Sequence, residues 1–171
     1  MNKGIVKALV PFLSKDSMRE ALACFHCTNS YIEATDAFMI ARVYGKTDFD
    51  DCLINIHELR TSKNLSRFPN NIDSIIAKSL GRVRNGNTEK VAWNDNKLEF
   101  IATITTIISS NDRKYSSVDA KKLGHCHKLT AAVLKSIPGM DGYAVEITVE
   151  EDRIVFNIDG LLFIASMLIR K

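Results

Sequence analysis

Residues 30–43 read SYIEATDAFMIARV, an apolar run rich in β-branched residues that is typical of a strand, with an aspartate in its middle. Aspartate is depleted in strands because its short carboxylate bonds nearby backbone N–H groups and water instead. The pattern predicts a strand over 31–43 and makes Thr35–Asp36 its most unusual feature. Three roles are open for Asp36 at this point: catalysis, metal binding, or shaping of the backbone.

The segment before this run permits two interpretations. Ser17 and Glu20 have the spacing of a capping box, and the apolar residues that follow them fit a helix. Equally, residues 21–27 fit a strand that turns at 28–30 and continues into 31–43. Periodicity favours the helix but leaves both interpretations open.

Two amphipathic helices are predicted elsewhere. The first covers 3–14, with a bend at Pro11 because proline removes one backbone hydrogen bond. The second covers 119–137, with Asp119 as its cap and Pro138 after its end. Its apolar residues share one face at 100° per residue. The opposite face is a stripe of Lys121, His125, Lys128, Ala132 and Lys135.

The charge of the chain is unevenly distributed. The chain has 23 basic and 20 acidic residues, a net charge of +3. Residues 118–137 contain four lysines and one aspartate, so this segment carries the whole excess. Residues 141–160 contain six acids and one arginine. We expect two faces of opposite potential, of which only the basic one attracts polyanions.

The second half of the chain is predicted to form strands. Residues 143–150 alternate apolar and polar, and the runs at 154–158 and 161–169 follow, which predicts a three-stranded meander with a wet, acidic outer face. In the middle of the chain, turn residues separate two further predicted strands, around 89–93 and over 97–110. Residues 82–90 are expected to form an exposed loop.

Length and composition are typical of a soluble globular protein with one domain of ordinary size or two very small ones. The chain has 171 residues, 46% of them hydrophobic and 25% charged. No run approaches the roughly 18 apolar residues of a membrane span, and charged residues interrupt the weak resemblance of the N-terminus to a signal peptide. Four cysteines in a chain of this length do not suggest a disulfide framework. We expect a cytoplasmic protein with reduced thiols and no membrane partner.

Cysteine and histidine residues suggest a zinc site, but their spacing argues against one. Residues 24–27 (Cys-Phe-His-Cys) and 125–127 (His-Cys-His) contain enough ligands for a tetrahedral ion. Adjacent helical residues diverge by about 100°, so His125 and Cys126 do not easily share an ion. The isolated acids Glu33, Asp36 and Glu58 have no partner at a catalytic spacing, and no phosphate loop or nucleophile motif is present. No enzymatic activity, metal or cofactor is expected.

Several short motifs and their spacing carry a family resemblance. Residues 14–16 (Ser-Lys-Asp) with Arg19 precede residues 34–36 (Ala-Thr-Asp) with Ala41, and a second helix and closing strands follow over 116–171. In this order they resemble the bacterial sliding clamp family, the DNA polymerase III beta subunits. The stretches DCLINIHELRTSKN and RFPNNIDSIIAK, at 51–64 and 67–78, are similar to phage-encoded relatives.

The resemblance implies an α+β fold in which two helices pack on antiparallel sheets. A single DNA-clamp-like domain would span 1–171, with an enlarged middle segment at about 48–117. The implied function is non-enzymatic: sequence-independent tethering of double-stranded DNA, or processivity, in replication or repair. The helices would line a DNA channel, with contacts from Lys3, Lys7, Lys15, Arg19, Lys121, Lys122, His125, Lys128 and Lys135.

The resemblance also favours the strand over 21–27 and a structural role for Asp36 within its strand. Some features depart from the family. Ala37 replaces a common glycine, and the usual first strand before Lys3 is missing or very short. Clamps have six domains per ring, so a ring would require self-association or partner subunits, with a DNA polymerase or clamp loader as further partners. The alternative is a clamp-fold protein-interaction module that does not encircle DNA.

Overall fold

The computed structural model describes residues 2–16, 18–58, 60–85, 88–110, 120–149 and 153–167, with 82–85, 108–110 and 120–125 described by their backbone only. Its α-helices are α1 (Lys3–Leu9), α2 (Ile72–Asn85), α3 (Lys97–Ser110) and α5 (Ala120–Ser136), and its 3-10 helices are η1 (Val10–Phe12) and η2 (Glu20–Ala23). Its strands are β1 (Phe25–Cys27), β2 (Tyr31–Thr35), β3 (Met39–Tyr44), β4 (Cys52–Asn55), β5 (Arg60–Ser62), β6 (Thr88–Ala92), β7 (Ala144–Val149), β8 (Arg153–Ile158) and β9 (Leu162–Met167).

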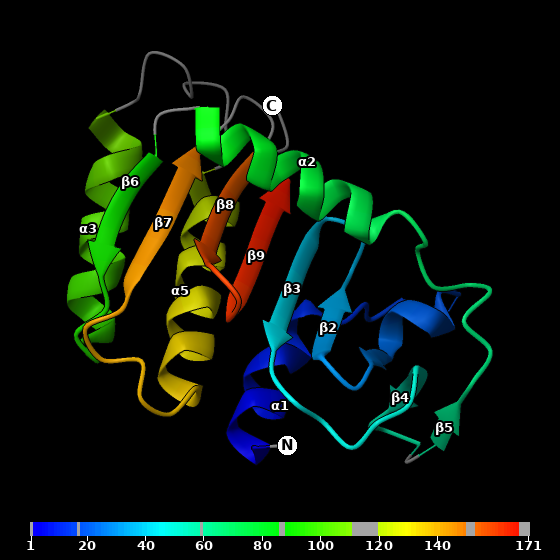
Figure 1. Cartoon of the computed structure of the whole chain (residues 1–171). Helices are drawn as coiled ribbons and strands as arrows, with labels where there is room; N and C mark the ends of the chain where they lie inside the picture. Colours follow the sequence, from blue (N-terminus) through cyan, green and yellow to red (C-terminus); the bar gives the residue numbers. More distant parts are fainter. Residues whose placement is uncertain are drawn as a thin grey trace.

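The strands form one antiparallel sheet, in the order β5-β4-β1-β2-β3-β9-β8-β7-β6 (Figure 1). Pairing of β3 with β9, from Met39↔Ser166 to Val43↔Leu162, joins the N-terminal half of the sheet to the C-terminal half. Each half contains a helix followed by three antiparallel strands, α1-β1-β2-β3 and α5-β7-β8-β9. This α+β arrangement, with two helices packed on an antiparallel sheet, confirms the predicted fold class.

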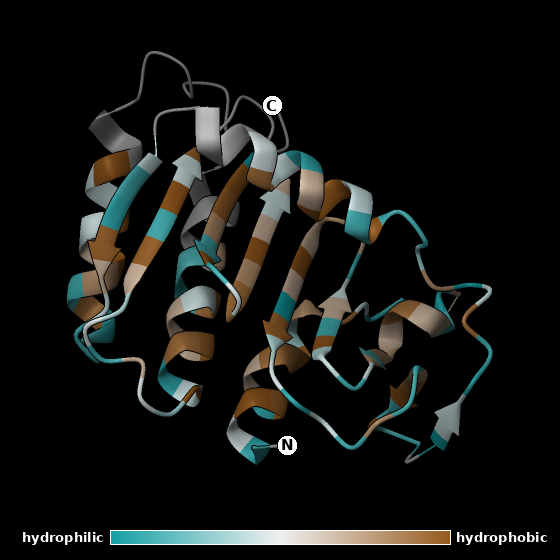
Figure 2. Ribbon diagram, viewed as in Figure 1, coloured by the Kyte–Doolittle hydropathy of each residue, from teal (hydrophilic) through white to brown (hydrophobic). Residues whose placement is uncertain are grey.

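Both faces of the sheet are covered. Along β8, Ile154 and Phe156 point into the larger core, which also contains residues of α1, α3 and α5, whereas Val155 points into a second core with Ile72 and Ile76 of α2. Figure 1 accordingly shows α2 crossing the front of the sheet, with α5 and α1 behind it. Figure 2 shows hydrophobic residues along β8 and β9 where α2 crosses them.

The predicted wet outer face of the closing strands is therefore wrong. Val155 and Phe163 on that face have no exposed surface, because α2 covers them. Residues 154–156 and 161–165 are nearly continuous apolar runs, the pattern of strands that are buried on both faces. Only β7 keeps the predicted alternation in part, with Val145 and Ile147 buried and Glu146 half-buried.

The run at 31–43 is a hairpin, not one strand, and Asp36 lies in its turn between β2 and β3. The Oδ1 atom of Asp36 accepts hydrogen bonds from the backbone N–H groups of Phe38 at 2.8 Å and Met39 at 2.7 Å. The predicted structural role of Asp36 is confirmed, and its predicted position within a strand is wrong. Ala37 has a φ of 77°, in the left-handed region that favours glycine.

The first helix and the segment after it also differ from the prediction. α1 ends at Leu9, and Pro11 lies in the first turn of η1, where its missing N–H costs no helical hydrogen bond. In the segment with two interpretations, residues 20–23 form the short helix η2 and only Phe25–Cys27 form a strand. The strand that the resemblance favours over 21–27 is therefore wrong for 21–24 and right for 25–27, and the helical interpretation holds only for 20–23.

Residues 97–110 form the helix α3, so the predicted strand there is wrong. Asn96 caps the helix: its Oδ1 accepts from the Glu99 N–H at 3.2 Å, and its Nδ2 donates to the Glu99 carboxylate at 3.2 Å. Phe100 and Ile104, four residues apart, are buried. The hydroxyls of Thr103, Thr105 and Thr106 donate to backbone carbonyls four residues earlier. The predicted loop over 82–90 is wrong at both ends, because α2 reaches Asn85 and β6 begins at Thr88.

His127 is a residue of α5, and its side chain is buried against β8. It is 2% exposed, and its ring lies edge-on to Phe156 with the centroids 5.9 Å apart. Its Nδ1 atom is buried without a hydrogen-bond partner. Burial lowers the pKa of His127 to about 4, since the charged form loses its hydration.

The Ala37→Gly substitution should stabilise the protein by roughly 0.5–1 kcal/mol, because glycine adopts a positive φ without the steric cost that alanine has. Urea unfolding followed by circular dichroism measures this change. The control is Ala102→Gly on the exposed side of α3, which should destabilise by about 1 kcal/mol. Destabilisation by Ala37→Gly would contradict the assigned turn.

Acid should destabilise the protein through His127. Its folded pKa lies below its unfolded value, so the unfolded chain binds more protons between pH 6.5 and about 4, and the free energy of unfolding falls as pH falls through this window. The full effect is at most roughly 3 kcal/mol. His127→Leu should flatten the pH dependence in chemical denaturation series, whereas His57→Gln at an exposed position should leave it unchanged. Equal slopes for wild type and His127→Leu would contradict this assignment.

Candidate nucleic-acid interface and outer-face ion network

Helices α1 and α5 lie side by side on the same face of the sheet (Figure 1). The Nδ2 atom of Asn2 donates to the backbone carbonyl of Ser136 at 3.3 Å, so the start of α1 is beside the end of α5. A Cβ atom placed on Gly4 would lie 3.7 Å from the Cβ of Ser136, an ordinary van der Waals contact. The two helices therefore form one continuous surface.

The outward side of this helix pair is positively charged. The apolar residues Leu9 of α1 and Cys126 and Leu134 of α5 have no exposed surface, which fixes which side of each helix faces the sheet. Four lysines on the other side are exposed: Lys3, Lys7, Lys128 and Lys135. None of these four lysines forms an ion pair with a carboxylate in the described part of the chain. Their charges remain available to an external anion.

The other predicted contact residues divide into two groups. Lys15 and Arg19 are exposed in the segment between η1 and η2, where Arg19 lies 3.6 Å from the carboxylate of Asp16 and is partly neutralised. The backbones of Lys121, Lys122 and His125 lie in α5, and their side chains lie outside the described residues.

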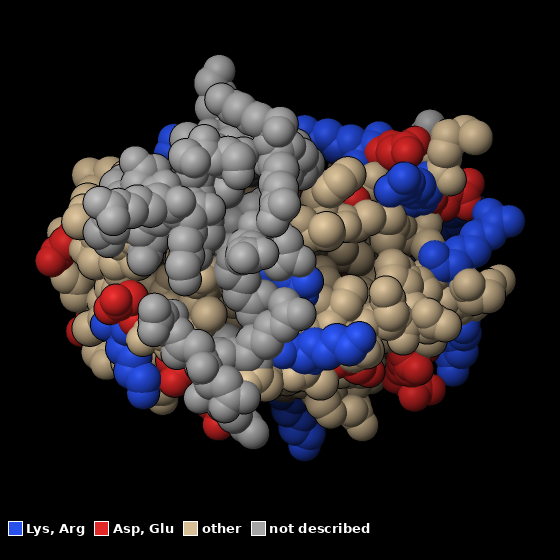
Figure 3. Space-filling view, turned by 90° about the horizontal axis from the view of Figure 1, so that it is seen from above, with Lys and Arg blue, Asp and Glu red and all other residues tan. Residues whose placement is uncertain are grey.

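Positive charge on this face does not continue onto α3. This helix packs beside α5, and Lys97 at its start is the only basic residue in its sequence. Figure 3 shows another side of the molecule, from above, where acidic and basic side chains lie next to one another around the grey atoms. Within what the structure describes, the helix pair α1–α5 is therefore a surface on which exposed lysines without ion-pair partners lie close together.

The cysteines do not form a metal site with the histidines in the part of the structure that is described. All four cysteines are free and buried, and no group of three potential ligands among the described residues is arranged to hold a metal. Burial raises the pKa of Cys27 and of Cys126 to about 12, so both thiols are protonated at neutral pH.

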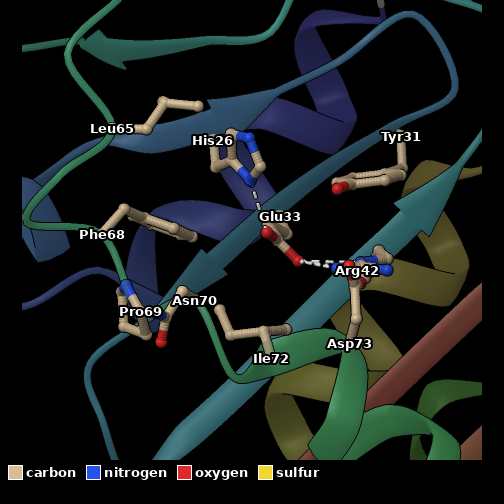
Figure 4. Close-up of a pocket in the computed structure, with 10 residues that line it drawn as sticks. All are labelled: His26, Tyr31, Glu33, Arg42, Leu65, Phe68, Pro69, Asn70, Ile72 and Asp73. Atoms are coloured by element: carbon tan, nitrogen blue, oxygen red, sulfur yellow. Dashed lines mark hydrogen bonds and ion pairs between the residues drawn. The ribbon is translucent and has the colours of Figure 1, made fainter.

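A buried ion network occupies the opposite face of the sheet (Figure 4). Glu33 of β2 is 1% exposed and binds two partners: His26 Nδ1 lies 2.6 Å from its Oε1, and Arg42 Nη2 lies 2.6 Å from its Oε2. Two exposed carboxylates complete the network. Asp51 accepts from His26 Nε2 at 2.7 Å, and Asp73 of α2 lies 2.7 Å from Arg42 Nη2.

The network changes the protonation of its members. Burial alone would lower the pKa of His26, but its bonds to Glu33 and Asp51 outweigh burial and raise it. Arg42 shows the same balance: burial opposes its charge, and the Glu33 and Asp73 carboxylates raise its pKa above the ordinary value. The guanidinium also lies over the Tyr31 ring, 3.9 Å from its centroid.

The sequence prediction missed this network, since it took Glu33 to be an isolated acid. The available signal was cross-strand: Glu33 is directly opposite Arg42 in the β2–β3 hairpin and opposite His26 in the β1–β2 pair. Placing the hairpin turn at Asp36 would have revealed the first of these pairs. The Asp73 contact depends on how α2 packs on the sheet, which local sequence does not indicate.

Comparison with solved structures shows the fold. The beta subunit of the DNA polymerase of Streptococcus pyogenes matches with a TM-score of 0.59 at 9% identity, over 98% of this chain and 62% of that chain. The DNA polymerase III beta subunit of Thermotoga maritima matches with a TM-score of 0.58 at 9% identity, over 97% of this chain and 61% of that one. A putative DNA polymerase III beta subunit of Eubacterium rectale gives 0.55 at 13% identity, over 98% and 62%.

The chain therefore has the sliding-clamp fold of DNA polymerase III beta subunits, which confirms the predicted resemblance at the level of fold. It spans about three fifths of the length of these structures. No protein-family model and no curated protein sequence matches it. The phage-encoded type stays a prediction. Among the described helices, none has both the length and the hydropathy that crossing a membrane requires.

Glu33→Gln should destabilise the protein by roughly 2–4 kcal/mol, because it leaves a buried guanidinium with one exposed partner. The folded pKa of His26 is raised, so protonated His26 contributes to stability below pH 6.5, and this contribution is lost as pH rises through the folded pKa. Because Glu33 is one of the two carboxylates that raise this pKa, the pH-dependent part of the stability should also be smaller in Glu33→Gln. The measurement is urea unfolding at several pH values. Glu58→Gln, at the exposed pair with Arg60, is the control and should change stability by less than about 1 kcal/mol. A loss no larger than that of the control would contradict the network.

Proposed function

We propose that this protein is a non-enzymatic, clamp-like DNA-binding protein that tethers a replication or repair activity to duplex DNA. The observation that carries the proposal is the outward side of the α1–α5 pair. There Lys3, Lys7, Lys128 and Lys135 are exposed and have no carboxylate partner among the described residues. The sliding-clamp fold also supports DNA binding through this surface, because α1 and α5 lie together on one face of the sheet.

Binding through such a surface is electrostatic. Each lysine that neutralises a phosphate releases condensed counterions, so affinity falls steeply with salt. Four lysines on two adjacent helices contact backbone phosphates and read no base edges, so binding is independent of sequence. Lys121, Lys122 and His125 belong to the same helix and are proposed to extend this contact along α5. Lys15 and Arg19 are proposed as peripheral contacts.

The edges of the sheet are the proposed sites of self-association into a ring around DNA. The sheet has two terminal strands, β5 and β6, and each has one side without a neighbouring strand in the described structure. Arg60, Thr61 and Ser62 of β5 are all exposed. An unpaired strand edge is a ready template for pairing with another chain. We propose that copies associate through these edges; light scattering after size exclusion would measure the assembly.

Neutralising the helix lysines should weaken DNA binding. A variant with Lys3, Lys7, Lys128 and Lys135 all changed to Gln should bind a duplex of mixed sequence at least tenfold more weakly at 50 mM salt. The slope of log affinity against log salt should decrease by up to about 3–4, the value for four lost phosphate contacts. Fluorescence anisotropy across a salt series gives both quantities.

The matched control changes Lys46, Lys63, Lys78 and Lys90 to Gln, which alters the net charge equally at exposed positions outside α1 and α5. It should retain most of the affinity and the slope. Equal loss in both variants would indicate a response to net charge alone and would contradict the helix surface. A wild-type monomer without measurable DNA affinity would instead support the alternative, a clamp-fold protein-interaction module.

A further inference from the structure

A small pocket lies on the outer face of the sheet, on the side opposite α1 and α5. Its volume is about 170 Å³, room for roughly five or six waters at liquid density or for one apolar side chain. Figure 4 shows that the segment 65–73 forms one wall, with Leu65, Phe68, Pro69 and Ile72. Four members of the ion network, His26, Glu33, Arg42 and Asp73, line its polar side. The pocket is thus apolar on one side and charged on the other.

Arg42 has one buried and one exposed carboxylate partner. Its side chain is 6% exposed and that of Glu33 is 2% exposed, whereas the side chain of Asp73 is 78% exposed. A carboxylate that is already well hydrated gains little from one contact with a guanidinium, because its alternative is water. Asp73 can therefore leave Arg42 at low cost, provided that another carboxylate takes its place. Glu33 cannot leave, since it is buried and also binds His26.

The buried part of the network favours an anion at the position of Asp73. It contains one carboxylate, Glu33, and two basic side chains, His26 and Arg42. From outside, the exposed acid Asp51 contacts His26 and the exposed acid Asp73 contacts Arg42. The ion pairs of Arg42 use Nε and Nη2, and Nη1 has no such partner among the described residues. A planar guanidinium with a free Nη1 is suited to bidentate recognition of a carboxylate.

We propose that this pocket binds the C-terminal carboxylate of a peptide whose last side chain is apolar, and that Asp73 occupies the carboxylate position when the site is empty. The carboxylate binds Arg42 in place of Asp73, and the apolar side chain lies against Leu65, Phe68 and Ile72. Asp73 is then an internal competitor, which lowers the apparent affinity by the fraction of time that it occupies Arg42. The inference does not depend on DNA binding, because the two surfaces lie on opposite faces of the sheet.

The test uses the peptide acetyl-Ala-Ala-Leu with a free C-terminal carboxylate and the same peptide with a C-terminal amide. Binding to the full chain is followed by NMR shifts of the Arg42 Nε–H and of the Phe68 and Ile72 signals. Asp73→Asn should bind the acid at least about fivefold more tightly than wild type does, and at least tenfold more tightly than it binds the amide. Asp159→Asn, at an exposed turn outside the pocket, is the control and should match wild type.

Asp73→Asn is chosen because Asp73 is exposed and its loss should leave the fold intact, which thermal unfolding verifies. Arg42→Lys provides a second variant: it keeps a positive charge beside Glu33 but loses the planar guanidinium, and it should abolish the preference for acid over amide. Equal binding of acid and amide, no gain in Asp73→Asn, or no binding at millimolar peptide would each overturn the proposal. Equal affinity for 3-methylbutanoate would overturn the peptide assignment and indicate a small-acid site.

Discussion

The pairing of β3 with β9 is the constraint on which the rest of the structure depends. Residues that are more than 100 positions apart in sequence align there in five pairs, and among the described strands only this ladder joins the two halves into one sheet. The Tyr44 N–H also bonds the Leu161 carbonyl, and the Met167 N–H bonds the Phe38 carbonyl, which extends the junction at both ends. Helix α1 reaches α5 because their two halves meet at this junction.

The sequence predicted most of the features that depend on local periodicity and on turn residues. The inward stripe of α5, the turn at 28–30 and the antiparallel strands follow from periodicity and turn chemistry, and these signals agree with one another. The prediction was wrong in α3, where strand propensity conflicts with helix-capping and burial signals. Threonine and isoleucine in α3 favour a strand, but Asn96 with Glu99 caps a helix there and Phe100 with Ile104 buries one side. Tertiary packing decided the outcome, as it commonly does for marginal propensities.

The basic helix surface was predictable because it depends on local helical periodicity and uncompensated charge. The ion network was not, because its members lie on three strands, a loop and α2. Glu33 and Arg42 become neighbours only after the hairpin register is known, and that register depends on a turn whose Ala37 lacks the usual glycine signal. A single aspartate in the middle of an apolar run was the clue to the turn, since its carboxylate caps two backbone donors.

Strand β3 shows how one sheet separates two kinds of surface. Ala41 and Val43 point into the core beneath α1 and α5, and Arg42 between them points to the outer face. A one-residue shift of β3 would put the guanidinium into the apolar core, where it would have no partner, so the Glu33–Arg42 pair also fixes register. The same alternation keeps the lysine surface and the outer pocket on opposite faces. A ligand on one face can therefore bind without displacing a ligand from the other.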